Sequence, residues 1–218
     1  MTPIDLRLYA VADTGQLDDG RIADAVAAAI RGGATAIQLR DKRDDTRARI
    51  ATAKALRAVV EAPVRLIVND RVDVALASGA DGVHLGRSDM SPEDARAILG
   101  PEAIVGITIH HAHEADATAR VDYAGLGPAY ATSSKDPGDP PLGAQGLARL
   151  VEAVHARLGP LPLCAIAGID RERVPAVIGA GVQGVAVIGA VFRQPDIEAA
   201  ARELRAAVDL ALERRDGA

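Results

Sequence analysis

Polar side chains that could bind an anionic heterocycle stand together in the segment QLRDK. Gln38 and Arg40 fall on the same side of a strand because side chains alternate with a period of two, and Lys42 follows where the strand would end. Two cations at this spacing could bind the oxygens of a polyphosphate, while Gln38 offers a donor and an acceptor to a heterocycle. The alternative is an ion pair at the rim with Asp41 or Asp44.

Two carboxylates follow the next two apolar runs. Asn69 and Asp70 end the run RLIVND, and Asp89 comes directly after DGVHLGRS. If these runs are neighbouring parallel strands, the two carboxylates lie close together and suit Mg²⁺ held through a shared substrate phosphate. Alternatively, Asp70 caps a helix that begins near Val72, and Asp89 caps SPEDARAIL. The two nearby cations favour the metal.

The later runs end on groups that suit a second anion. GLGPAYATSSK ends with Thr132, Ser134 and Lys135, which could donate several hydrogen bonds to an anion or form an ordinary turn. Gly168 and Gly189 end the last two runs, where many barrel enzymes bind phosphate through backbone N–H groups. We therefore expect one anion site with cations and carboxylates, and a second that is neutral and built on glycine.

The histidines and the single cysteine carry weaker signals. His110, His111 and His113 lie close together in HHAHE, but their spacing matches neither the HExxH helix nor a zinc finger. His84 lies in the fourth run and could contact the site or only stabilise it. Cys164 stands inside an apolar run, which predicts a small core residue and not a disulfide.

These side chains need elements that bring them to one place. Eight short apolar runs alternate with segments of helical spacing at residues 21–31, 46–61, 72–77, 92–99, 112–119, 147–158, 171–179 and 196–214. This alternation predicts parallel βαβ units and a single (β/α)8 TIM-barrel domain over residues 1–218, in which all strand ends meet around one mouth. A doubly wound open sheet is the alternative, because alternation does not show closure.

One connection is longer than the others. Residues 133–146, SSKDPGDPPLGAQG, are rich in proline and glycine and have no periodicity of their own. Loops of this length in a compact domain are usually functional or disordered. We expect a mobile flap over the mouth, with a solvated surface connection as the alternative.

Composition limits the classes of partner. The chain has 218 residues and a net charge of -5, from 25 basic and 30 acidic residues. This balance argues against nucleic acid bound along a broad surface. No signal peptide or apolar stretch long enough to span a bilayer is present, so we expect no membrane partner and a soluble, cytoplasmic protein. The sequence does not decide whether the chain forms a homodimer.

Taken together, seven segments resemble the thiamine-phosphate synthase family. They run in order from Leu8 to Phe192 and read LYAVAD, QLRDK, IVNDRVDVAL, DGVHLGRSDM, GPAYATSSK, AIAGI and GVAVIGAV. The combination is much more specific than any one segment. The resemblance implies an enzyme that joins hydroxymethylpyrimidine diphosphate to thiazole phosphate with Mg²⁺, giving thiamine phosphate and diphosphate.

The resemblance also implies roles for individual residues. The pyrimidine, its diphosphate and Mg²⁺ would be held by Gln38, Arg40, Lys42, Asn69, Asp70 and Asp89. Further substrate contacts fall on Thr108, Thr132, Ser134, Lys135, Gly168, Ile188 and Gly189, the last three with the thiazole phosphate. Four positions depart from the family pattern, namely Thr108, Ser134, Ala167 and Gly189. Ala167 matters most, because its methyl group would crowd the phosphate loop or tilt its backbone.

The implied reaction needs no general base. Mg²⁺ with Arg40, Lys42 and Lys135 would neutralise the leaving diphosphate, and the thiazole nitrogen would attack the pyrimidine cation. One alternative is a related thiazole tautomerase, an isomerase that would need a proton-transfer histidine. Another is a noncatalytic sensor of a phosphate ligand on the same scaffold.

Overall fold

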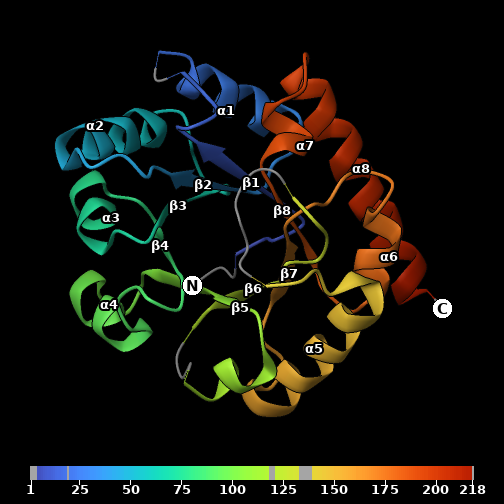
Figure 1. The fold of residues 1–218 in the computed structure, drawn as a ribbon. Coiled ribbons are helices and arrows are strands. Elements are labelled where there is room, and N and C mark those ends of the chain that lie inside the picture. The colour runs from blue at the N-terminus through green and yellow to red at the C-terminus, as the bar shows by residue number, and fades with distance from the viewer. Residues whose placement is uncertain (1–3, 19, 118–120, 133–138, 218) are drawn as a thin grey trace.

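Eight parallel strands form a closed barrel in the computed structural model, which describes residues 4–18, 20–117, 121–132 and 139–217 (Figure 1). Each strand pairs with the next in the chain, and β8 pairs with β1. The strands are β1 Leu8–Asp13, β2 Ala36–Arg40, β3 Arg65–Asn69, β4 Gly82–Leu85, β5 Ile104–Ile109, β6 Tyr123–Leu126, β7 Leu163–Ile166 and β8 Gly184–Val187. The TIM-barrel prediction is confirmed, and the open sheet is wrong.

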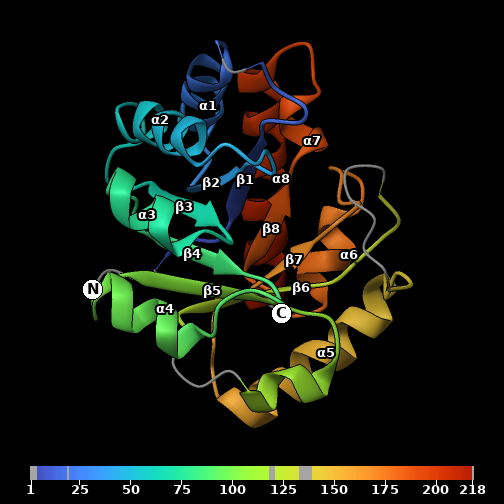
Figure 2. The ribbon, with the colours of Figure 1, turned by 60° about the vertical axis from the view of Figure 1, so that its left-hand side comes forward.

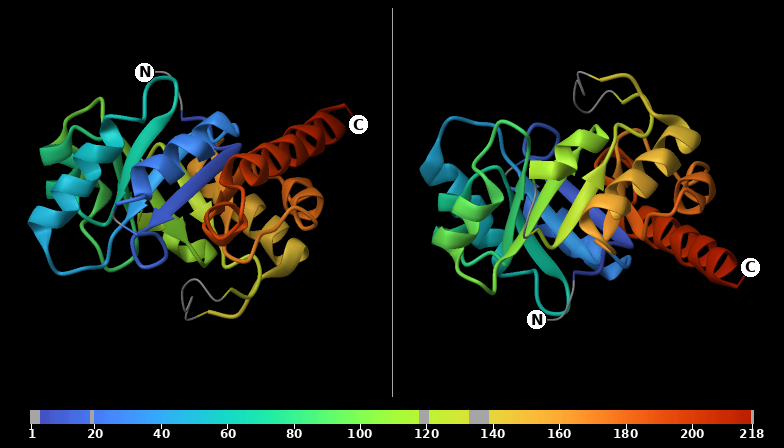
Figure 3. Two further views of the ribbon diagram at one scale, coloured as in Figure 1. Left: turned by 90° about the horizontal axis from the view of Figure 1, so that it is seen from above. Right: turned by 90° about the horizontal axis from the view of Figure 1, so that it is seen from below.

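The helices form an outer ring around the strands (Figure 2). They are α1 Ile22–Arg31, α2 Thr46–Arg57, α3 Val72–Ser78, α4 Pro92–Leu99, α5 Gly143–Leu158, α6 Val174–Gly179, α7 Gly189–Phe192 and α8 Ile197–Asp216. The segment Ala112–Ala117, labelled η1, is a 3-10 helix. Figure 3 shows α8 running outward past its neighbours at the C-terminal end of the chain. No helix in the described ranges is long and apolar enough to cross a membrane.

Several helical segments differ from the sequence expectation; α2, for example, ends at Arg57 and not at residue 61. α5 begins at Gly143 and not at Leu147, because the N–H groups of Leu142 and Gly143 donate to the carbonyls of Pro128 and Ala129 at 2.9 Å each. These tertiary hydrogen bonds outweigh the low helix propensity of glycine. Conversely, α6 begins three residues later than expected, and a short helix, α7, follows β8 directly.

The barrel interior has its own core, separate from the one between strands and helices. Tyr9, Tyr123 and Cys164 are buried there with Ile4 and Leu6. These last two residues precede β1 and close the end of the barrel at which the strands begin, here called the lower end. In a chain with 2% aromatic residues, two tyrosines thus fill the centre. The second core consists mainly of alanine, valine, leucine and isoleucine, as expected where helices pack on a parallel sheet.

Close approach of the N-terminal segment to β8 requires a glycine. A Cβ atom built on Gly184 would lie 1.8 Å from the backbone oxygen of Leu6. Backbone atoms held in a barrel cannot move aside as the end of a flexible side chain can. The lower end of the barrel therefore closes only if this position has no side chain.

We expect the variant Gly184→Ala to lose about 3 kcal/mol of unfolding free energy, because the new methyl group overpacks the closed end. Gly179→Ala is the matched control, since a Cβ there would meet nothing within 4 Å. Urea denaturation of both variants measures the difference. Equal stability of the two would show that the N-terminal segment is not held against β8.

Candidate active site

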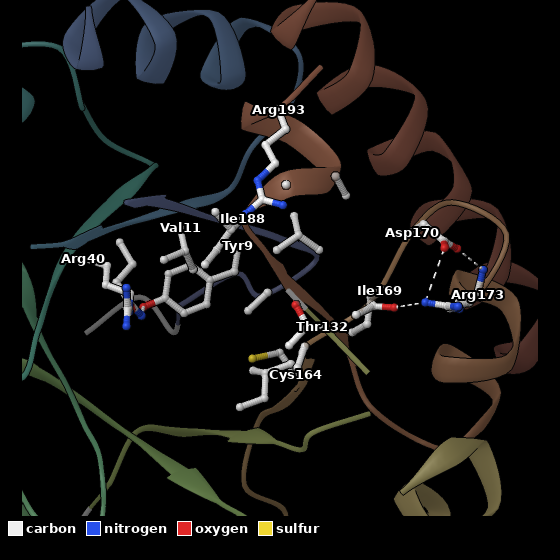
Figure 4. A pocket seen from close by; sticks show the side chains of 18 of the residues that line it. Tyr9, Val11, Arg40, Thr132, Cys164, Ile169, Asp170, Arg173, Ile188 and Arg193 are labelled. Carbon is white, nitrogen blue, oxygen red and sulfur yellow. Dashed lines mark hydrogen bonds and ion pairs between the residues drawn. The ribbon is translucent and has the colours of Figure 1, made fainter. Parts of the chain in front are cut away.

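A cavity of about 510 Å³ opens at the carboxyl ends of the strands. Strands on all sides contribute to it, because residues two apart on each strand share the interior face. Of the residues expected from the sequence, it is lined by Gln38, Arg40, Asn69, Thr108, Thr132, Gly168, Ile188 and Gly189. Figure 4 shows Arg40 on one side of the cavity and Arg173 on the other. The structure therefore brings most of the expected groups to one mouth.

Arg40 is held by an acid that sequence reasoning missed. Its guanidinium donates to Asp13 Oδ2 at 2.5 Å, and Asp13 Oδ1 accepts from the N–H of Gly15 at 2.8 Å. Asp13 is the last residue of β1 and stands opposite Arg40 in the strand register. The proposed rim pairs with Asp41 or Asp44 are wrong for Arg40. The sequence did contain a signal for this residue, since Asp13 ends an apolar run just as Asp70 does.

Lys42 lies outside the cavity lining and forms an ion pair with Asp70. Asp41 pairs instead with Arg43. Asp70 adopts a left-handed backbone conformation with φ 63°, and its N–H donates to the carbonyl of His84 at 2.8 Å. Such a conformation is costly for a residue other than glycine and is often found at functional sites. Like Lys42, Asp70 is not among the residues that line the cavity.

Asp89 is close enough to Asp70 for the two carboxylates to influence each other. Its Oδ2 accepts from the N–H of Gly86 at 2.7 Å. Burial raises the pKa of Asp89, and the neighbouring Asp70 carboxylate raises it further. Two crowded carboxylates of this kind suit a divalent cation, which would relieve their repulsion.

The capping alternatives for these two acids are wrong. The N-cap of α3 is Arg71, and no side chain caps that end. α4 is capped by Ser91, whose hydroxyl accepts from the N–H of Asp94. Asp70 and Asp89 are thus not needed to start their helices. No group of three or more potential metal-binding His, Cys, Asp or Glu residues occurs among the residues described, so a cation on these two acids would need substrate or water oxygens.

Two consecutive left-handed residues shape the loop after β7. Ala167 has φ 71° and Gly168 has φ 64°. A Cβ on Gly168 would lie 2.4 Å from the carbonyl oxygen of Ala131, so only glycine fits there. Tyr130 N–H donates to the Ala167 carbonyl at 3.2 Å, which ties this loop to the segment after β6. Ala167 therefore keeps a glycine-like backbone at a conformational cost.

The second anion site is not neutral, contrary to the sequence expectation. Arg173 and Arg193 both line the cavity beside Gly168 and Gly189 (Figure 4). Arg173 donates to the carbonyl of Gly168 at 2.5 Å and lies 4.6 Å above the Tyr130 ring. Neither arginine was predicted from the sequence, because the sequence does not show in which direction a basic side chain beside a short helix points.

The remaining expected groups fall in three places. Ser134, Lys135 and the first part of the expected flap lie outside the described residues. His110 Nδ1 lies 2.7 Å from the carbonyl of Gly127, and His111 pairs with Asp139 at 3.3 Å, away from the cavity lining. Burial raises the pKa of the Cys164 thiol to about 12, so it is no activated nucleophile.

Comparisons with known proteins agree with one another. The family model described as thiamine monophosphate synthase matches residues 8–191. Thiamine-phosphate synthase of Agrobacterium fabrum is 45% identical over 218 residues, covering 99% of this chain and 99% of that protein. The enzyme of that name from Xanthobacter autotrophicus is 46% identical over 210 residues, covering 94% and 97%. The solved structure of thiamine phosphate pyrophosphorylase from Pyrococcus furiosus has a TM-score of 0.83 at 37% identity, covering 96% and 98%.

The strain at Ala167 leads to a stability prediction. In Ala167→Gly, removing the left-handed cost of about 1–2 kcal/mol should outweigh the chain entropy of glycine, about 0.5–1 kcal/mol, so the variant gains up to about 1 kcal/mol. Ala165→Gly, on buried β7, is the control and should lose stability. Thermal unfolding measures both. A loss in Ala167→Gly would show that the left-handed conformation carries no strain.

Proposed function

Because the chain belongs to the thiamine monophosphate synthase family, it is a transferase that forms thiamine phosphate, and we propose that it joins hydroxymethylpyrimidine diphosphate to thiazole phosphate by dissociative substitution in this cavity. The family resemblance expected from the motifs is thus confirmed. The observation that carries the mechanistic proposal is the placement of cationic groups on opposite sides of one cavity, with Arg40 facing Arg173. Two anionic substrates need such an arrangement to meet.

The diphosphate is assigned to the side formed by β2, β3 and β4. Asp70 and Asp89 would hold Mg²⁺, whose charge would offset that of the diphosphate oxygens. Arg40 and Lys42 would bind the same oxygens. Both cations already have a carboxylate partner, so they are oriented before substrate arrives.

The reaction breaks one bond and forms one. The bond between the pyrimidine methylene carbon and the diphosphate oxygen breaks, and its electron pair leaves with the diphosphate. The thiazole nitrogen then gives its lone pair to the methylene carbon. No proton leaves either atom, so the residues need only stabilise charge and exclude water.

The thiazole phosphate is assigned to the loops after β7 and β8. Backbone N–H groups at Gly168, Ile188 and Gly189 would contact it, and Arg173 and Arg193 would add positive charge. Gly189 has no hydroxyl, and a Cβ there would lie 3.1 Å from Arg193 Cδ. The Arg193 side chain thus lies in contact distance of the position that a side chain at residue 189 would take.

The tautomerase and the noncatalytic sensor gain no support from the comparisons, since the relatives described above are named as synthases. Incubation of the protein with both substrates and Mg²⁺, followed by chromatography for thiamine phosphate, tests the proposal. Absence of product at any Mg²⁺ concentration would contradict it.

We expect the dependence of activity on Mg²⁺ to require Asp89. In Asp89→Ala, turnover should fall about a hundred-fold or more, because a ligand to the charge-neutralising cation is lost. Thermal shift gives a second measurement, since Mg²⁺ with diphosphate should stabilise the natural protein but not the variant. Glu93→Ala, in the first turn of α4, is the control. Full activity of Asp89→Ala would remove this residue from the metal site.

The two anion sites should respond separately to mutation. Arg173→Gln should raise KM for thiazole phosphate about ten-fold or more, because a charge-assisted hydrogen bond is lost, and leave KM for the pyrimidine diphosphate unchanged. Arg171→Gln is the matched control, since Arg171 pairs with Glu203 on the surface. Steady-state kinetics with each substrate varied in turn decides. Equal rises in both KM values would indicate general disruption of the mouth.

A further inference from the structure

A continuous chain of hydrogen bonds crosses the interior of the barrel at the floor of the cavity. Gln38 Nε2 donates to the Tyr9 hydroxyl at 2.7 Å, and the hydroxyls of Tyr9 and Tyr123 are 2.8 Å apart. The Tyr123 hydroxyl lies 2.9 Å from His84 Nδ1, and His84 Nε2 lies 2.8 Å from Thr108 Oγ1. Gln38, Tyr9, His84 and Thr108 all line the cavity, whereas Tyr123 does not.

The middle of this chain is built into the core. Tyr9 and Tyr123 are fully buried and pack edge to face, with ring centroids 5.8 Å apart. A Cβ on Gly106 would lie 2.0 Å from Tyr123 Cζ, so the ring enters the barrel only because residue 106 is glycine. Burial raises the pKa of both phenols, so each hydroxyl keeps its single proton at neutral pH.

A chain of this kind has a direction. Tyr9 accepts from Gln38, and Tyr123 is the other hydrogen-bond partner of its hydroxyl among the described residues, so the one Tyr9 proton goes to the oxygen of Tyr123. Tyr123 must then donate to His84 Nδ1, and the imidazole proton stands on Nε2, from which it is donated to Thr108. The hydroxyl proton of Thr108 can then be donated to a ligand in the cavity. At the other end, the chain uses the amide nitrogen of Gln38 and leaves the carbonyl oxygen for a ligand.

The two ends are therefore coupled. If the amide of Gln38 turned over, every hydrogen bond in the chain would have to reverse; Thr108 would then donate its proton to His84 and offer the cavity an acceptor in place of a donor. A single misplaced proton would leave a buried donor or acceptor without its partner, which costs more than one hydrogen bond contributes. The chain thus has two complete arrangements, and the structure holds the one with an acceptor at Gln38.

We propose that Tyr9 and Tyr123 are positioning residues that fix an acceptor at Gln38 and a donor at Thr108, and so select an amino-substituted heteroaromatic ring over its oxo analogue. The amino N–H would meet the Gln38 carbonyl. An oxo group would place a second acceptor against it, and binding would require reversal of the whole chain. The identity of the ring rests on the proposed function, whereas the direction of the chain does not.

The direction is tested in the protein without ligand. With ¹⁵N-labelled histidine, NMR should show a neutral His84 ring with its proton on Nε2 and a hydrogen-bonded Nδ1, the signal being assigned by its loss in His84→Asn. In Tyr123→Phe, the Nδ1 signal should move to that of a nitrogen without a hydrogen bond. Tyr130→Phe, outside the chain, should change nothing. A proton on Nδ1 in the natural protein would overturn the proposal.

Selectivity is tested by binding alone, so that it does not depend on turnover. Calorimetry should show that the aminopyrimidine diphosphate binds more tightly than its 4-oxo analogue, and that Tyr9→Phe reduces this ratio about ten-fold or more. Circular dichroism checks that the variant is folded. An equal loss of affinity for both ligands would reduce Tyr9 to a packing residue. If the NMR result and the selectivity are as expected but no thiamine phosphate forms, the proposed function is wrong and the proposed direction of the hydrogen-bond chain is retained.

Discussion

The interior of a closed barrel can be filled only by alternate residues of its strands, and this constraint governs the rest of the molecule. Here the lower layer contains the two tyrosine rings and forms part of the cavity floor through Tyr9 and Cys164, while residues two positions further along the strands line the cavity above it. Tyr9 is followed by Val11, and Ala36 by Gln38. Packing below therefore sets the position and direction of the polar groups above, through the same strand period.

Electrostatic pairing organises the upper rim in a similar way. Arg40 is matched by the buried Asp13 and Lys42 by Asp70, so the positive charges facing an anion are oriented by acids from neighbouring strands. Burial raises the pKa of Asp89 and the neighbouring Asp70 carboxylate raises it further, while the Gly86 N–H and the charge of Lys42 act in the opposite direction. The rim thus combines held cations with one carboxylate that gains most from a metal ion.

The sequence predicted the barrel because the period and order of its elements depend on local chemistry. It also predicted that Gln38, Arg40 and Asn69 would face one mouth, since these follow apolar runs at strand spacing. It did not predict Asp13 as the partner of Arg40, because strand register depends on the closed sheet. Arg173 and Arg193 were missed because the direction of a long side chain from a short helix is set by tertiary packing. The start of α5 was misplaced because hydrogen bonds to Pro128 and Ala129 outweigh propensity.

Ile4 and Leu6 are buried at the end of the barrel where the strands begin, and they close that end beneath the cavity. Gln38 is buried, whereas Arg173 is exposed near the mouth. On the proposed assignment, the molecule recognised by Gln38 binds deeper than the one recognised by Arg173 and must therefore enter first. A phosphate compound bound alone near the mouth would therefore keep the pyrimidine diphosphate out until it dissociated.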